Sequence, residues 1–205
     1  MSLLLIRHGE TALNVSRTLQ PEDSPLSERG HAQAKALGCR LAASDLAGIV
    51  CSDLPRARQT ADYLARATGL PIATSVLLRE RDFGAWRGRA YADLPIDPLR
   101  MVEAPPEGES MQQFLNRAAA AFADLCRRRS RSGGPLAVVT HGLMVLAMLE
   151  RHAQLADGQV MPASLRNTSV SIVDAEAPHR ISLLDDVGHL DEPPLAGPAS
   201  ILSGG

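Results

Sequence analysis

The sequence predicts an α/β fold, a three-layer sandwich whose central sheet is largely parallel and carries helices on both faces. Short runs made only of apolar residues are typical of strands buried inside a parallel sheet. The longer segments between them repeat their apolar residues at helical spacing. These strand and helix signals alternate along the chain, and that order is characteristic of α/β proteins.

The first strand is the apolar run over residues 3–6, which stops at Arg7 and His8. Gly9 follows, and a glycine lets the backbone turn sharply without Cβ strain. In open α/β sheets, ligands bind in the crevice at the carboxyl ends of the strands. Arg7 and His8 are therefore candidates for chemistry. The alternative, in which Arg7 caps the strand and His8 is an ordinary loop histidine, stays open on these residues alone.

The elements that follow continue the alternation up to the middle of the chain. Ser27 is a helix-capping residue, and Pro55 suits the first turn of a helix. The expected elements are a loop over 20–25, a helix over 27–43, a strand over 48–51, a helix over 55–69 and a strand over 71–78. The residues expected to face inward on the first helix are Ala32, Ala36, Leu37, Cys39, Leu41 and Ala42.

The second half of the chain repeats the pattern. Ser110 caps a helix that ends in three consecutive arginines, 127–129, which the helix dipole stabilises without a nucleic-acid partner. We expect one domain over residues 1–190 and a partly mobile tail over 191–205, which is rich in Pro, Gly, Ser and Ala. The remaining expected elements are a charged loop over 79–84, a surface excursion over 91–108, a strand over 136–140, a helix through 149 and strands over 170–173 and 180–184.

Composition narrows the class of protein. The 205 residues suffice for a full core, and a net charge of -2 provides no field that would attract nucleic acid or anionic membranes. The three cysteines have no paired spacing and predict reduced thiols in a cytoplasmic protein. The chain enters its first strand without a targeting signal, and no stretch reaches the roughly 18 apolar residues of a membrane span.

Two histidines, His8 and His141, follow two separate buried strands and are each followed by glycine. Parallel strands end on the same side of a sheet, so the two side chains are expected to face one crevice. A metal site is disfavoured because the neighbouring residues are arginines and no H-E-x-x-H pattern occurs. A serine hydrolase is disfavoured because no G-x-S-x-G elbow occurs. A phosphoryl group remains, and arginines are its preferred partners.

The residues also suggest how such a group would be transferred. A neutral imidazole attacks phosphorus through one nitrogen while the other donates to an acceptor that sets the tautomer. Arg7 and Arg56 would hold the equatorial oxygens. Glu80, in the charged loop, would protonate the leaving alkoxide.

Arg7-His8-Gly9-Glu10-Thr11 resembles the signature of the histidine phosphatase superfamily, the phosphoglycerate-mutase-like fold. The resemblance extends over residues 3–190 and carries its motifs in the family's order. Two positions depart from the pattern: Pro21 stands where many members have glycine, and Leu143 where a second glycine is frequent. The further stretches that carry the resemblance are 20–30, 52–61, Arg79-Glu80 with 83–88, 139–142 and 167–170.

The resemblance implies a role for each matching residue. His8 would become the phosphohistidine, and Glu80 would act as acid and then as base for the attacking water. No metal or organic cofactor is needed in this family. The implied phosphate pocket consists of Arg7, Arg56 and His141, with further contacts from Asn14, Thr11 and Gly142.

Several other residues have a plainer interpretation. Arg58 is expected at the surface, and Trp86 is expected to be a packed anchor rather than part of the substrate pocket. Glu10 and Glu109 are expected to start a turn or a helix rather than to act as acids. The histidines without a place in this scheme are His31, His152, His179 and His189.

The same machinery serves two reactions. A phosphatase passes the phosphoryl group from His8 to water, whereas a mutase returns it to another hydroxyl of the substrate. Mutases carry longer insertions that exclude water, and the excursion over 91–108 is short, so we favour a phosphomonoester phosphatase. Phosphoglycerate mutase and an inactive phosphate-binding protein remain the alternatives. The expected partner is a small phosphomonoester, not nucleic acid or a membrane, and a homodimer is considered beside a monomer.

Overall fold

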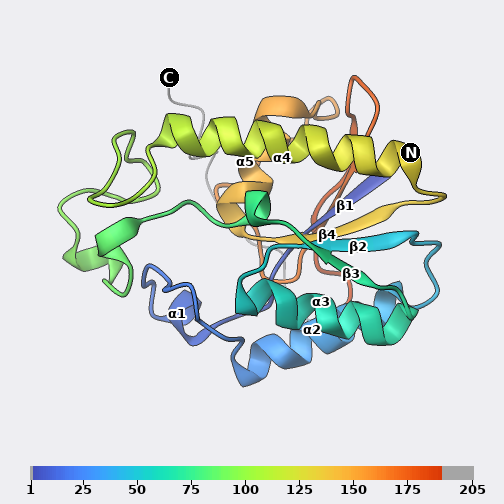
Figure 1. Ribbon diagram of the computed structural model, residues 1–205, viewed down its shortest axis with the longest axis horizontal. Helices are drawn as coiled ribbons and strands as arrows, with labels where there is room; N and C mark the ends of the chain where they lie inside the picture. The colour runs from blue at the N-terminus through green and yellow to red at the C-terminus, as the bar shows by residue number, and fades with distance from the viewer. Residues whose placement is uncertain (1, 191–205) are drawn as a thin grey trace.

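The computed structural model describes residues 2–190, and the tail predicted over 191–205 lies outside them. A single six-stranded sheet has the strand order β3-β2-β4-β1-β5-β6 (Figure 1). The four strands from β3 to β1 run parallel, whereas β5 is antiparallel to β1 and β6 to β5. The predicted α/β class with a largely parallel sheet is therefore confirmed. The strands are β1 (Ser2–Arg7), β2 (Gly48–Cys51), β3 (Ile72–Thr74), β4 (Leu136–Thr140), β5 (Val170–Asp174) and β6 (Ile181–Asp186).

Helices cover both faces of the sheet (Figure 1). The pair α2 and α3 packs on one face, and α4 and α5 pack on the other. None of the helices within residues 2–190 combines the length and apolar character that crossing a bilayer requires. The helices are α1 (Ala12–Val15), α2 (Glu28–Leu41), α3 (Pro55–Thr68), α4 (Met111–Arg131) and α5 (Gly142–His152), with 3₁₀ turns η1 (Val76–Leu78), η2 (Gly84–Trp86) and η3 (Tyr91–Asp93).

The wholly apolar sequence of β1 follows from this layering. Leu3 and Leu5 point into the core formed with α4 and α5, whereas Leu4 and Ile6 point into the core formed with α2 and α3. Successive strand residues face opposite sides of a sheet. A strand covered on both faces therefore needs apolar residues at every position.

The helix ends carry the predicted signals. The Ser27 side chain accepts a hydrogen bond from the Gly30 N–H at the start of α2. Ser110 forms a capping box with Gln113 at the start of α4. Gly69, in the left-handed conformation with φ 73°, ends α3.

The inward face of α2 differs from the prediction. Ala32, Cys39 and Ala42 are exposed, whereas Gln33 and Gly38 are buried. The reason is a close approach to α3, since a Cβ on Gly38 would lie 2.9 Å from the carbonyl oxygen of Tyr63. Beside the predicted Leu37 and Leu41, the buried face therefore also holds small and polar residues, which an apolar pattern does not reveal.

The strand predicted over 71–78 is also wrong in its second half. Regular pairing ends at Thr74, and residues 76–78 form the turn η1. The Ser75 N–H still bonds to the Cys51 carbonyl, and the carbonyl of the buried Leu78 accepts from Thr140 Oγ1 at 2.6 Å. These bonds direct the chain over the ends of β2 and β4, where the predicted chemistry lies.

Candidate active site

The two predicted histidines lie side by side. His8 follows β1 and His141 follows β4, and Arg7 is paired with Thr140 at the ends of these parallel strands. The ring centroids are 5.2 Å apart, with an interplanar angle of 63°. The exposed fractions are 3% for His8 and 0% for His141. The two imidazoles therefore share one buried site, as the strand order predicts.

His8 presents a defined ring nitrogen. Its Nδ1 lies 2.7 Å from the carbonyl oxygen of Gly9. A carbonyl oxygen only accepts, so Nδ1 carries the proton and Nε2 keeps its lone pair in the neutral ring. Burial lowers the pKa of His8 well below its ordinary value of 6.5, and the charges of Arg56 and Arg7 lower it further. At neutral pH, His8 is therefore an uncharged imidazole whose Nε2 lone pair is available.

Gly9 serves close packing rather than the sharp turn that the sequence suggested. Its backbone does not adopt the left-handed conformation. A Cβ on Gly9 would lie 2.6 Å from the carbonyl oxygen of Gly30 in the first turn of α2. The Gly9 N–H also donates to Thr60 Oγ1 on α3 at 3.0 Å. The chain beside His8 is thereby held between two helices.

Two arginines flank His8. Arg7 precedes it in β1 and donates from Nη1 to the carbonyl oxygen of Leu165. Arg56, in the first turn of α3, is 3% exposed and donates from Nη1 to the carbonyl oxygen of Pro21 at 3.3 Å. Burial lowers the pKa of both guanidinium groups, that of Arg56 to about 10. Both remain cationic at neutral pH.

Hydrogen-bond donors in this site lack partners. Within residues 2–190, the Nε atoms of Arg7 and Arg56 and the Nδ1 of His141 are buried and make no hydrogen bond. A buried polar group without a partner costs about 1–3 kcal/mol, so such groups call for a functional explanation. Three of them in one cationic site favour an anionic ligand with several acceptor oxygens.

His141 is oriented by a serine. Its Nε2 lies 2.9 Å from Ser52 Oγ, and Ser52 Oγ accepts from the Leu54 N–H at 3.3 Å. The serine hydroxyl can then donate to Nε2, which leaves the ring proton of the neutral imidazole on Nδ1. Burial lowers the pKa of His141 well below 6.5, and Arg56 is the next cause. With the serine hydroxyl donating to Nε2, the neutral His141 ring can donate through Nδ1.

Glu80 reaches the same cavity from the segment after η1. Its Oε1 accepts from the Arg81 N–H at 3.0 Å, and its Oε2 accepts from the Leu143 N–H in the first turn of α5 at 3.1 Å. Burial raises the pKa of Glu80 above its ordinary value of 4.5, although these two bonds and the charges of Arg56 and Arg7 oppose the shift. The carboxyl group is held in place and retains its proton to higher pH than a solvated glutamate.

Arg7, His8, Arg56 and Glu80 line a cavity of about 600 Å³, whereas His141 is not among its lining residues. This volume is in the range of small-molecule sites. The excursion over 91–108 contributes Tyr91 and Leu99 to the wall. Gly142 lies against Arg7, since a Cβ there would be in ordinary van der Waals contact, at 3.4 Å from Arg7 Nε. The polar lining includes Arg7, His8, Asn14, Arg56, Glu80 and Gly142, and the apolar lining includes Leu13, Leu19, Phe83, Leu99, Leu143 and Leu146.

Thr11 lies away from this lining. It caps α1, with its hydroxyl donating to Gln20 Oε1 at 3.0 Å and accepting from the Asn14 N–H at 3.1 Å. It therefore positions Asn14 and Gln20, which do line the cavity. Asn14 Oδ1 accepts from the Thr11 N–H and from Asn167 Nδ2, so its own amide NH₂ is turned to donate.

The residues with plainer interpretations lie elsewhere. Arg58 is exposed and pairs with Asp62 at 3.0 Å. Trp86 packs against the core and is not part of the cavity wall. Glu10 accepts from Ser27 and Arg29. The other histidines contact Tyr63 (His31), Phe122 (His152 and His179) and Arg40 and Thr168 (His189).

Sequence reasoning missed several supporting residues. Ser52 gives the same signal as His8, a polar residue directly after a buried strand, and could have been found. Glu109 was expected only to begin a helix, but it pairs with Arg117 at 2.7 Å. Arg117 gives no signal, because an isolated arginine on a helix resembles any surface arginine. Among residues 2–190, no three His, Cys, Asp or Glu side chains are grouped so as to hold a metal ion.

Comparisons with known proteins agree with this geometry. A Citrobacter koseri protein named probable phosphoglycerate mutase GpmB is 34% identical, over 95% of this chain and 97% of its own. The structure of mycobacterial glucosyl-3-phosphoglycerate phosphatase is 28% identical with a TM-score of 0.74, over 90% of this chain and 98% of its own. That of the alpha-ribazole phosphatase from Shigella flexneri is 26% identical with a TM-score of 0.78, over 94% and 100%. The model of the histidine phosphatase superfamily (branch 1) matches residues 3–184, and the chain belongs to that superfamily.

Proposed function

We propose that the protein is a phosphomonoester phosphatase that acts on a small phosphorylated metabolite through a phosphohistidine on His8. The observation that carries the proposal is the group of unpartnered donors on Arg7, Arg56 and His141 around a neutral imidazole. A phosphoryl group offers acceptor oxygens to these donors and an electrophilic phosphorus to Nε2 of His8.

The first half-reaction transfers the phosphoryl group to the enzyme. The lone pair of His8 Nε2 forms the P–N bond while the P–O ester bond breaks. The leaving alkoxide takes the proton of the Glu80 carboxyl group and departs as an alcohol. Positive charge develops on the imidazole, and the bond from Nδ1 to the Gly9 carbonyl stabilises it. Arg7 and Arg56 stabilise the charge on the equatorial oxygens.

The second half-reaction returns the enzyme to its starting state. The Glu80 carboxylate takes a proton from a water molecule whose oxygen attacks phosphorus. The P–N bond breaks, its electron pair returns to His8 Nε2, and inorganic phosphate leaves. Glu80 is then protonated again. Its raised pKa suits both roles, because the group must give and regain a proton near neutral pH.

Phosphoglycerate mutase is the second candidate, since curated relatives carry that name. A mutase would need a cation for the carboxylate of a phosphoglycerate. The rim arginines Arg79 and Arg87 already pair with carboxylates, both with Glu22 and each with an aspartate. These pairs leave neither arginine free to bind a substrate carboxylate, so we favour hydrolysis of a phosphomonoester that carries none. The three free cysteines favour a cytoplasmic place of action.

Two assays test the proposal. The purified protein is expected to hydrolyse 4-nitrophenyl phosphate with equal rates with and without EDTA. Incubation with 3-phosphoglycerate is expected to form no 2-phosphoglycerate, and release of phosphate is expected from members of a broad phosphomonoester panel that carry no carboxylate. No turnover of any member of the panel would favour a phosphate-binding protein, loss of turnover in EDTA would favour a metal enzyme, and accumulation of 2-phosphoglycerate would favour a mutase.

A further inference from the structure

We propose that Arg117, on α4, is a positioning residue that holds the backbone of the acid loop, residues 77–82, so that the Glu80 carboxyl group faces the leaving oxygen. The inference rests on the proposed function, because it concerns the proton donor of that reaction. It assigns Arg117 no contact with substrate.

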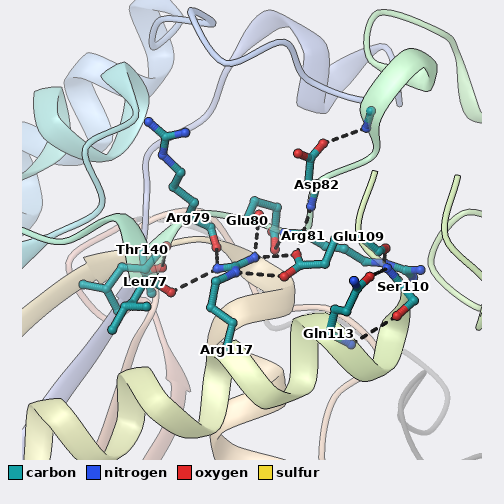
Figure 2. A network of polar contacts seen from close by, with 12 residues as sticks. Leu77, Arg79, Glu80, Arg81, Asp82, Glu109, Ser110, Gln113, Arg117 and Thr140 are labelled. Atoms are coloured by element: carbon teal, nitrogen blue, oxygen red, sulfur yellow. Dashed lines mark hydrogen bonds and ion pairs between the residues drawn. The ribbon is translucent and has the colours of Figure 1, made fainter. Parts of the chain in front are cut away.

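All five N–H donors of the Arg117 guanidinium are engaged (Figure 2). Nη1 donates to the carbonyl oxygens of Leu77 at 3.0 Å and Arg79 at 2.6 Å. Nη2 donates to the carbonyl oxygen of Glu80 at 3.1 Å. The remaining donors form a two-point bond with the Glu109 carboxylate, at 2.9 Å from Nε and 2.7 Å from Nη2. No donor is left over for a ligand.

The acid loop depends on these bonds because, beyond η1, it has no regular structure of its own. Residues 79–83 lie between the turns η1 and η2 and belong to no helix or strand. Within residues 2–190, the carbonyl oxygens of Leu77, Arg79 and Glu80 accept no backbone hydrogen bond. Arg117, which lies on the 21-residue helix α4, donates to all three of these carbonyl oxygens. The position of the loop is thereby tied to a rigid element.

Glu109 completes the connection from the far side of the loop. Its Oε2 accepts from the Asp82 N–H at 3.3 Å, and its own N–H donates to the Asp82 carbonyl oxygen at 2.9 Å. The Arg117–Glu109 pair is therefore hydrogen-bonded to the backbone both before Glu80, at Arg79, and after it, at Asp82 (Figure 2). Arg117 is not among the charges that shift the pKa of Glu80, so its action on the acid loop is through geometry.

The consequence is specific to proton transfer. General acid catalysis contributes about 10²–10⁴-fold, and a misplacement of about 1 Å can cost about 10²-fold. A loosened acid loop should therefore slow the expulsion of poor leaving groups. Good leaving groups, which depart without a proton, should be slowed much less. A general loss of folded protein would instead slow all substrates equally.

The experiment compares kcat/KM over a series of substituted phenyl phosphates, from 4-nitrophenyl to 4-methoxyphenyl phosphate. This constant reports phosphoryl transfer to His8 and is insensitive to the later hydrolysis step. Four proteins are compared: wild type, Glu80→Gln, Arg117→Gln and the control Arg129→Gln. Arg129 is a buried arginine of the same helix that bonds to Ser132 at the opposite end. Thermal unfolding of each variant verifies the fold.

We expect Arg117→Gln to lower kcat/KM for 4-methoxyphenyl phosphate by about 10–10²-fold, with a much smaller loss for 4-nitrophenyl phosphate. Glu80→Gln should show the same dependence on the leaving group, and Arg129→Gln should match the wild type. In the Glu80→Gln background, Arg117→Gln should have little further effect, because residues that act through one another are not additive.

An equal loss for all leaving groups, or full additivity with Glu80→Gln, would overturn the role of Arg117. If Arg117→Gln does not fold, Glu109→Gln takes its place, because it leaves the three carbonyl bonds of Arg117 intact. Glu109→Gln should lower kcat/KM less than Arg117→Gln does, but again more for poor leaving groups than for good ones. An equal loss of kcat/KM for all leaving groups would again overturn the role of Arg117. A wild-type protein that turns over no phosphate ester contradicts the proposed function instead.

Discussion

Ser52 and His141 are hydrogen-bonded through Oγ and Nε2 at 2.9 Å, and both side chains are fully buried. A serine hydroxyl that donates to Nε2 leaves the ring proton of His141 on Nδ1, the atom that lacks a partner within the described residues. We therefore predict that Ser52→Ala lowers kcat/KM about 10–10²-fold, through loss of one oriented hydrogen bond to a charged ligand. Nitrogen-15 NMR of the imidazoles should show a mixed tautomer for His141.

The control for this variant is Ser171→Ala. Ser171 is equally buried, but its hydroxyl accepts from the Asp185 N–H away from the cavity. Wild-type kinetics and an unchanged His141 spectrum in Ser52→Ala would show that the serine does not set the tautomer.

A pH profile follows from the shifted pKa values. The pKa of His8 and His141 lies well below 6.5, so both rings stay neutral in mild acid and lose function only as pH falls through the lowered values. The pKa of Glu80 is raised above 4.5, so the required proton is lost as pH rises through the higher value. We expect kcat/KM for phenyl phosphate to be highest in the acidic to neutral range. Glu80→Gln should remove the alkaline limb.

The pH profiles of the wild type and of Glu80→Gln are measured with the same substrate. The ionisation of the substrate therefore cancels in the ratio of the two profiles. A ratio that does not change with pH would rule out Glu80 as the titrating acid.

Anion binding should stabilise the protein through Arg56. Vanadate at about 100 times its Kd contributes about 2.7 kcal/mol to the free energy of unfolding, which corresponds to a rise in Tm of about 5–10 °C. Arg56→Gln should abolish most of this rise. Arg58→Gln, two residues further along α3 and paired with Asp62 at the surface, should retain it. An equal loss in both variants would place the phosphate elsewhere.

Close backbone packing near His8 should tolerate no side chain at Gly30. A Cβ there would overlap the carbonyl oxygen of Glu10. Gly30→Ala should therefore destabilise the protein by about 1–3 kcal/mol, the usual cost of overpacking, despite the better helix propensity of alanine. Gly133→Ala is the matched control, since a Cβ there meets nothing within 4 Å. Equal denaturation midpoints for the two variants would contradict this account of the packing.

The sequence predicted those parts of the fold in which hydrophobic burial alone determines the pattern of residues. The apolar run of β1 could be assigned because a strand covered on both faces is apolar throughout. The rule that parallel strands end together placed His8 beside His141. The inward face of α2 could not be predicted, because Gln33 and Gly38 are buried by a polar bond and a backbone contact rather than by hydrophobicity.

The supporting residues of the site depend on tertiary contacts that no local pattern encodes. The segment after Thr74 leaves the sheet because Thr140 and Arg117, both far away in the chain, hold its carbonyl groups. Arg58 and Arg117 look alike in the sequence, yet one pairs at the surface and the other organises the acid loop. The role of a residue could therefore be predicted where the end of a strand positions its side chain. It could not be predicted where a partner distant in the sequence positions it.

Trapping of the phosphoenzyme tests the central claim most directly. Wild-type protein mixed with a ³²P-labelled phosphomonoester and quenched in alkali should carry label that is stable to base and released by acid, as a phosphohistidine is. His8→Ala should carry none, whereas Arg58→Gln should be labelled like the wild type. Label that remains on His8→Ala would contradict the account. Hydrolysis of the ester by the wild type without any labelled protein would also contradict it.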